Sequence, residues 1–209
     1  MKFLWNSGVE IEPRIRILGY MVNRLIVFEK DKLYHIYNRG RNKQQLFFMH
    51  RDYERFLENL HKFQKSCPNI EIFAWCLIPN HFHFLLIEKS RDQDQDQDTY
   101  PKDTYPKAKQ ISKFMQKLQQ AYAAFFNAKY GESVKKGLKG PVFEGRFKAK
   151  AVEDEDYLYH LRRYIEWNAV KHEMVDKPEE WLYSSYVPGP YCEESLPEDI
   201  LFSDFEFEL

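Results

Sequence analysis

Two histidines that flank a phenylalanine, His81-Phe82-His83, are the residues whose types and spacing could most directly hold a metal ion. They lie in a run of β-forming residues, and on a strand residues i and i+2 project from the same face. The two imidazoles would point one way while Phe82 points into the core, which makes a ready edge for a divalent cation. The pair alone is unspecific, because in an isolated His-x-His one histidine is more often at the surface and the other hydrogen-bonded.

Tyr164 and Asn168 form a second candidate pair, on a segment with helical periodicity at residues 158–170. Residues four apart on a helix share a face. A tyrosine hydroxyl is a poor nucleophile at its usual pKa of ~10, but it can attack a phosphate that a divalent cation polarises. The amide oxygen could complete a His/His/Asn ligand set for Mg²⁺ or Mn²⁺. The alternative is structural: Tyr164 packs in a helix interface and Asn168 caps the end of the helix.

Tyr122 is a rival nucleophile, because it lies in a basic segment that is expected to be helical from about residue 108 to residue 130. One turn after it stands Phe126 rather than a polar ligand, and the neighbouring apolar residues form a stripe at helical spacing. The sequence therefore assigns Tyr122 to the core.

The periodicity of the chain also predicts the elements that must position these side chains. Helices are expected at 50–66 and 108–130, and a last one follows the acidic run at 153–156. Strands are expected at 32–40, at 70–78 and 81–88 as a hairpin closed by Pro79-Asn80, and at the end of 140–152. The order β-α-β-β-α-β-α predicts an α+β fold. It is a ferredoxin-like sandwich, an antiparallel sheet with helices on one face plus an extra C-terminal catalytic helix.

Length and composition fit one domain with decorations, since the chain has 209 residues of which 44% are hydrophobic. We expect an N-terminal extension at 1–30, a catalytic domain at 31–172 and an acidic C-terminal tail at 173–209. Residues 91–107 hold an Asp-Gln repeat and the sequence DTYPK twice in tandem. They contain too few apolar side chains to pack, so a mobile insertion is expected there.

Charge is unevenly distributed, although the net charge is only −1. Lys and Arg exceed Asp and Glu by about nine in residues 101–150, and the excess is reversed by about ten in residues 173–209. A basic middle beside an acidic tail favours a polyanion-binding face. The three cysteines include no Cys-x-x-Cys pair, and no apolar run approaches the ~20 residues of a membrane span. A cytoplasmic location without membrane contact is therefore expected.

Five segments occur in an order that resembles the REP-associated tyrosine transposases, relatives of the single-tyrosine HUH insertion-sequence transposases. The resemblance covers residues 31–186 and rests on YHIYNRG, AWCLIPNHFHFLLIE, GPVFEGRFKAKAV, YIEWNAV and WLYSSY. Two departures are mild: Ala169 replaces the proline of the usual Asn-Pro-Val, and Phe143 replaces the tryptophan that usually precedes Glu-Gly-Arg. The Asp-Gln tract is atypical.

The resemblance implies a role for each candidate residue. The two metal-binding histidines of that family fall on His81 and His83, its third ligand on Asn168, and its nucleophile on Tyr164. The implied reaction is a metal-dependent transesterification of single-stranded DNA. The tyrosine oxygen attacks a phosphodiester to give a 5′-phosphotyrosine and a free 3′-hydroxyl, and the reverse step joins strands.

DNA recognition must come from basic side chains elsewhere on the chain. The candidate phosphate contacts follow the first predicted strand and surround the last one: Arg39, Arg41, Lys43, Arg146, Lys148 and Lys150. For each of them, ordinary surface charge is an equal alternative. Members of the similar family bind imperfect hairpins and are typically monomers, so the resemblance implies a single-stranded DNA hairpin as partner and a monomeric protein.

Other functions stay open beside this one. A replication initiator or relaxase of the HUH kind would use the same chemistry, but those proteins often carry additional domains for which this chain has no room. A non-catalytic nucleic-acid binder on a ferredoxin-like sheet, including a decayed transposase, would need no metal set, yet all four polar positions are present. An RNA-recognition module would need a Lys/Arg-Gly-Phe-Gly-Phe type motif, which the sequence lacks. A metallohydrolase would need a carboxylate-rich second motif, which is also missing.

Overall fold

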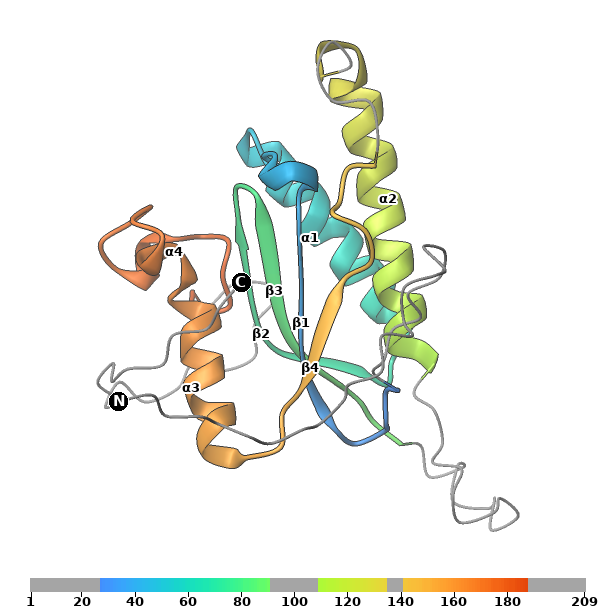
Figure 1. Cartoon of the computed structure of the whole chain (residues 1–209), viewed down its shortest axis with the longest axis vertical. Helices are drawn as coiled ribbons and strands as arrows, with labels where there is room; N and C mark the ends of the chain where they lie inside the picture. Colours follow the sequence, from blue (N-terminus) through green and yellow to red (C-terminus); the bar gives the residue numbers. More distant parts are fainter. Residues whose placement is uncertain (1–26, 91–108, 135–140, 188–209) are drawn as a thin grey trace, which may run out of the picture.

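The computed structural model describes residues 27–90, 109–134 and 141–187 of the chain (Figure 1). The elements follow one another as β1 (Leu33–Arg39), the short 3₁₀ helix η1 (Arg41–Lys43), α1 (His50–Lys65), β2 (Ile70–Ile78), β3 (His81–Glu88), α2 (Lys109–Val134), β4 (Lys148–Ala151), α3 (Glu155–Glu166), α4 (Asn168–Lys171) and η3 (Pro178–Glu180). The predicted α+β class and strand-helix order are confirmed. The expected insertion at 91–107, most of the N-terminal extension and the end of the acidic tail lie outside the described residues.

The four strands form one antiparallel sheet in the order β2-β3-β1-β4. Pro79 and Asn80 make the tight turn between β2 and β3, as the sequence predicts. In the register of β1 against β3, Tyr37 pairs with His83 and Arg39 with His81. The histidine pair therefore lies in the middle of the sheet, at the end where β1 runs into η1.

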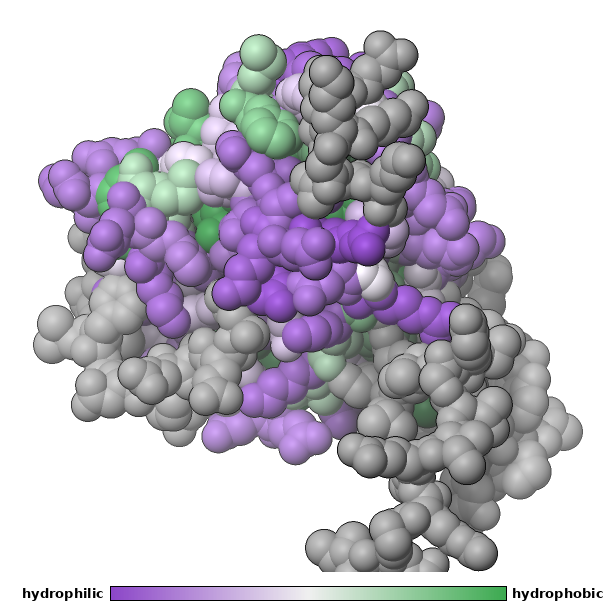
Figure 2. All heavy atoms as spheres, turned by 45° about the horizontal axis from the view of Figure 1, so that its top comes forward, coloured by the Kyte–Doolittle hydropathy of each residue, from purple (hydrophilic) through white to green (hydrophobic). Residues whose placement is uncertain are grey.

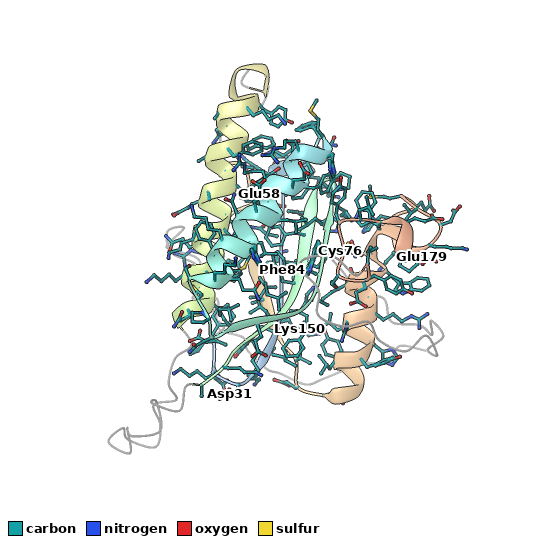
Figure 3. The ribbon with its side chains drawn as sticks, turned by 180° about the vertical axis from the view of Figure 1, so that it is seen from behind. Asp31, Glu58, Cys76, Phe84, Lys150 and Glu179 are labelled. Carbon is teal, nitrogen blue, oxygen red and sulfur yellow. The ribbon has the colours of Figure 1, made fainter. Side chains whose placement is uncertain are left out.

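The two faces of the sheet are covered by different helices (Figure 1). The helices α1 and α2 pack on one face, in a core that includes Phe82 and Phe84 of β3. The helix α3 packs on the other face, against Cys76 of β2 and Leu85 of β3. Figure 3 shows Phe84 on the side of α1 and Cys76 on the side of α3. Because side chains alternate along β3, the same pattern sends His81 and His83 to the face that α3 covers.

The last helix is divided, whereas the sequence predicts one helix through residue 170. It ends at Glu166, and α4 begins at Asn168 after Trp167, whose φ of −91° and ψ of 9° depart from α-helical values. The Trp167 indole packs under the Arg163 guanidinium, 4.8 Å from ring centroid to guanidinium carbon. The bend buries Asn168 and Ala169 completely. Asn168 thus enters the interior as the first residue of α4.

The chain after α4 runs along the edge strand β2. The backbone amide of Leu77 donates to the carbonyl of Tyr183 at 2.8 Å, and that of Ser185 donates to the carbonyl of Trp75 at 2.8 Å. Ser185 Oγ also donates to the Glu166 carboxylate of α3 at 3.0 Å. The first part of the acidic segment therefore shields a sheet edge and ties α3 to it. Within the described residues, no helix is long and apolar enough to cross a membrane.

Candidate metal and nucleophile site

The imidazoles of His81 and His83 lie together under α3, with ring centroids 5.0 Å apart and planes nearly perpendicular. His81 Nδ1 is 2.7 Å from Asn80 Oδ1, and His83 Nδ1 is 2.9 Å from His35 Nε2. Both Nε2 atoms are buried and have no hydrogen-bond partner in the described chain. Each ring is therefore held through Nδ1, which leaves Nε2 as its one uncommitted nitrogen.

Burial also sets the charge of these rings. It lowers the pKa of His81 to about 4 and the pKa of His83 well below its usual value, and the neighbouring His172 lowers both further. The interaction of Asn168 with His81 acts in the opposite direction but does not cancel burial. At neutral pH both imidazoles are uncharged, which is the form that binds metal.

Tyr164 and Asn168 complete the cluster from the other side. The Tyr164 ring packs edge-on against His83, with centroids 5.7 Å apart, and only 7% of the residue is exposed. Burial raises the pKa of the Tyr164 hydroxyl, and the nearby Asn168 side chain lowers it in part. The Asn168 side chain interacts with both Tyr164 and His81, so its amide lies near both groups.

These residues fit a divalent cation. Both polar atoms of the Asn168 side chain are buried without a hydrogen-bond partner of good geometry in the described chain, like the Nε2 atoms of His81 and His83. Leaving buried polar atoms unsatisfied costs free energy, and coordination of one ion would remove that cost. Among the described residues, no group of three His, Cys, Asp or Glu side chains could hold a metal. The set is therefore two imidazoles and an amide oxygen, a mixture that Mg²⁺ or Mn²⁺ accepts when water or phosphate oxygens fill the remaining positions.

A cavity of about 400 Å³ opens beside His81. Three of the six predicted DNA contacts line it, namely Arg39, Lys43 and Lys148. Figure 2 shows the end of the molecule that carries the β2–β3 turn, with hydrophilic side chains spread over its centre. The cavity thus places three basic side chains beside His81.

The basic side chains of the wall are not equivalent. Arg39 is paired with the Glu144 carboxylate through two hydrogen bonds. The Lys148 Nζ lies 5.8 Å from the centroid of the Tyr37 ring. Lys150 follows on β4, where its Nζ lies 4.7 Å from the Tyr157 ring of α3. Lys150 and the two remaining candidates, Arg41 and Arg146, do not line the cavity.

Sequence reasoning missed several neighbours of the site. His35 contacts His83, and His172 lies in the cavity with its ring centroid 5.2 Å from that of His81. Lys171 places its Nζ 4.8 Å from the Tyr164 ring centroid. His172 follows Asn168 at helical spacing, a signal that could have found it. His35 gave no such signal, because its closeness to His83 depends on how two distant strands pair.

Tyr122 lies on the opposite side of the sheet. It is fully buried among the core residues that α1 and α2 cover, and its hydroxyl donates to the Leu46 carbonyl at 2.7 Å. Burial raises the pKa of this hydroxyl far above its usual value. Its position agrees with the assignment to the core.

The α+β fold, an antiparallel sheet with α1 and α2 on one face and α3 on the other, is similar to that of a solved transposase. The chain is similar to a solved structure of a REP-associated tyrosine transposase bound to a REP hairpin. The TM-score is 0.54 at 19% identity, over 86% of this chain and 98% of that one.

Two further solved structures are similar at lower TM-scores. One is a transposase candidate from Deinococcus radiodurans R1, with a TM-score of 0.40 and 16% identity over 69% of this chain and 94% of that one. The other is a tRNA(His) guanylyltransferase from Saccharomyces cerevisiae, with a TM-score of 0.41 and 12% identity over 74% and 71%. No protein-family model and no curated protein sequence matches the chain.

Proposed function

We propose that the protein is a REP-associated type of tyrosine transposase: a metal-dependent enzyme that cleaves and rejoins single-stranded DNA at hairpin sequences through a 5′-phosphotyrosine. The observation that carries this proposal is the convergence of three buried, unsatisfied ligand groups, from His81, His83 and Asn168, beside the phenol of Tyr164. The similar fold of a transposase bound to a REP hairpin supports the substrate class.

The chemistry divides between the ligand set and the nucleophile. His81, His83 and Asn168 would hold a Mg²⁺ or Mn²⁺ ion, which supplies positive charge beside the reacting phosphate. The Tyr164 oxygen attacks the phosphorus, the bond from phosphorus to the 3′ oxygen breaks, and the phenolic proton is released. The leaving oxygen takes up a proton and becomes a 3′-hydroxyl. Lys171, over the Tyr164 ring, favours the negative charge that develops on the phenol during attack.

One chain supplies the whole site, which supports a monomer. Tyr164 packs against the histidines of its own chain, and the Ser185–Glu166 hydrogen bond holds α3 to the sheet edge. An arrangement in which two subunits exchange the tyrosine helix would have to break these contacts.

A non-catalytic DNA binder is the main alternative. Such a protein would need the basic cavity but not the unsatisfied nitrogens, which cost stability unless a ligand occupies them. A replication initiator or relaxase shares the chemistry and differs in its substrate. Formation of a covalent adduct separates the enzymes from a non-catalytic DNA binder. The DNA sequence on which the adduct forms separates a transposase from a replication initiator or relaxase.

The test is a covalent adduct with a single-stranded hairpin oligonucleotide in the presence of Mn²⁺. We expect an SDS-stable protein–DNA band when the label is on the 3′ end of the DNA, because the downstream fragment keeps the phosphate that joins tyrosine. A label on the 5′ end should leave with the released fragment. Chelation with EDTA should abolish the band and added Mn²⁺ should restore it. A protein that binds the hairpin tightly and forms no adduct with either label would overturn the proposal.

Lys148→Ala is expected to weaken hairpin binding without changing its sequence preference. Its ammonium lies at the cavity wall, where it can neutralise one phosphate. Removing one such contact should reduce the slope of log affinity against log salt by about 1. Salt titrations of a fluorescent hairpin measure this slope. Lys62→Ala, on α1 across the sheet, is the matched control, and equal effects of both substitutions would remove Lys148 from the interface.

A further inference from the structure

The side chain of His83 is hydrogen-bonded to His35 of β1, with His35 Nε2 and His83 Nδ1 2.9 Å apart. The two rings are nearly parallel, with an interplanar angle of 22° and centroids 5.1 Å apart. In the sheet, His35 pairs with Leu85 and His83 with Tyr37, so the two histidines are diagonal neighbours on one face. The sheet itself therefore fixes this contact.

The hydrogen bond between His35 and His83 differs from the one between Asn80 and His81 in which group can be the donor. The Asn80 oxygen can only accept, so it requires a proton on His81 Nδ1 and leaves the His81 Nε2 lone pair free. An imidazole nitrogen can donate or accept. The His35–His83 pair therefore has two neutral arrangements: one in which His83 Nδ1 donates to His35 Nε2, and one with the opposite direction.

Only the first arrangement allows His83 to bind metal. When His83 Nδ1 donates, His83 Nε2 carries a lone pair, and when His35 donates, His83 Nε2 carries a hydrogen and cannot ligate. His35 is 6% exposed and His83 is fully buried, and burial disfavours the imidazolium form of both rings. With both rings neutral, each carries one N–H proton, and coordination at His83 Nε2 selects the arrangement in which the His83 proton lies on Nδ1 and the His35 proton on its own Nδ1.

We propose that His35 is a positioning residue: by accepting a hydrogen bond from His83 Nδ1, its Nε2 holds His83 in the tautomer and orientation whose Nε2 can ligate a divalent cation. This inference rests on the metal site of the proposed function. Partners of this kind orient metal-binding histidines, and their loss typically lowers metal affinity about 10- to 100-fold.

The experiment compares Mn²⁺ affinity, from the paramagnetic resonance signal of free Mn²⁺, in two variants of His35. His35→Phe keeps the ring but has no acceptor, and it should bind Mn²⁺ about 10- to 100-fold more weakly than the unchanged protein. His35→Gln places an amide oxygen near the former Nε2 and should recover affinity to within about threefold. His61→Phe on α1, across the sheet, should leave the affinity unchanged. A purely structural role would lower thermal stability in both His35 variants without this split in affinity.

A second readout needs no substitution. In protein labelled with ¹⁵N-histidine and saturated with diamagnetic Mg²⁺, long-range ¹H–¹⁵N correlations should show the His83 proton on Nδ1. A proton on Nε2, or equal Mn²⁺ affinity of His35→Phe and the unchanged protein, would overturn the inference. Failure of the proposed function looks different: Mn²⁺ binding that depends on His35, with no covalent DNA adduct, refutes the transposase and keeps the positioning role.

Discussion

Tyr164→Phe is expected to abolish the covalent protein–DNA adduct while hairpin and Mn²⁺ binding persist. The substitution removes one oxygen and leaves a ring of the same shape against His83 and His35. A phenyl ring cannot form a phosphoester, so the variant lacks the proposed nucleophile. Adduct formation should fall by about 10³-fold or more, to the background of the assay. Mn²⁺ affinity should change little, because the three proposed ligands remain.

Tyr122→Phe is the matched control for this result. It also removes one buried tyrosine oxygen, here the donor to the Leu46 carbonyl, but on the other side of the sheet. Its adduct yield should equal that of the unchanged protein, and only stability should fall. Mass spectrometry of the digested adduct should locate the nucleotide on the peptide that contains Tyr164. An adduct that survives in Tyr164→Phe would assign the nucleophile to another residue.

Local patterns were enough to predict the elements and the face on which the histidines lie. Alternation along β3 puts the phenylalanines on one face and the histidines on the other, and Pro79-Asn80 closes the hairpin. The convergence of Tyr164 with His83 could not be obtained from spacing, since the two lie on different elements. This convergence was predicted from the resemblance to a family, and it agrees with the packing of Tyr164 of α3 against His83.

The remaining features depend on tertiary contacts that no local pattern contains. The helix bend at Trp167 accompanies burial of Asn168, which helical periodicity alone cannot foresee. The contact of His35 with His83 joins residues 48 apart in the sequence, and strand register decides it. The strand-like pairing of Ser184 with Cys76 likewise requires the sheet edge to exist first. In each case burial of apolar neighbours fixes the geometry, and the polar contact follows.

Asp52→Ala is expected to cause a large loss of stability, although Asp52 lies outside the site. The Asp52 carboxylate is fully buried at the start of α1. It accepts hydrogen bonds from the backbone amides of Phe48 and Met49 at 2.9 and 3.0 Å, from Tyr130 at 2.7 Å, and from Lys129 at 2.6 Å. Removal of the carboxylate leaves these donors unsatisfied, which should cost about 3 kcal/mol.

The loss of stability in Asp52→Ala should be larger at neutral pH than in acid. Burial raises the pKa of Asp52, but the hydrogen bonds from Lys129, Tyr130 and the two amides outweigh burial and hold the pKa below its usual value. A carboxyl with a lowered pKa in the folded state stabilises the protein above its unfolded pKa of about 4. That contribution disappears as the pH falls through the folded pKa. Urea unfolding of Asp52→Ala and the unchanged protein should therefore differ most near pH 7 and converge in acid.

The loop before α1, residues 46–49, connects Asp52 to the turn beside the site. Asp52 holds the amides that end this loop, and the same loop donates from the backbone of Leu46 and Phe47 to the Pro79 carbonyl in the turn before His81. Lys129→Ala is the control, because it removes only a partly exposed partner and should cost about 1 kcal/mol or less. If Asp52→Ala unfolds at the same urea concentration as Lys129→Ala, the carboxylate does not anchor the loop, and the turn before His81 must be held by Pro79 and its neighbours alone.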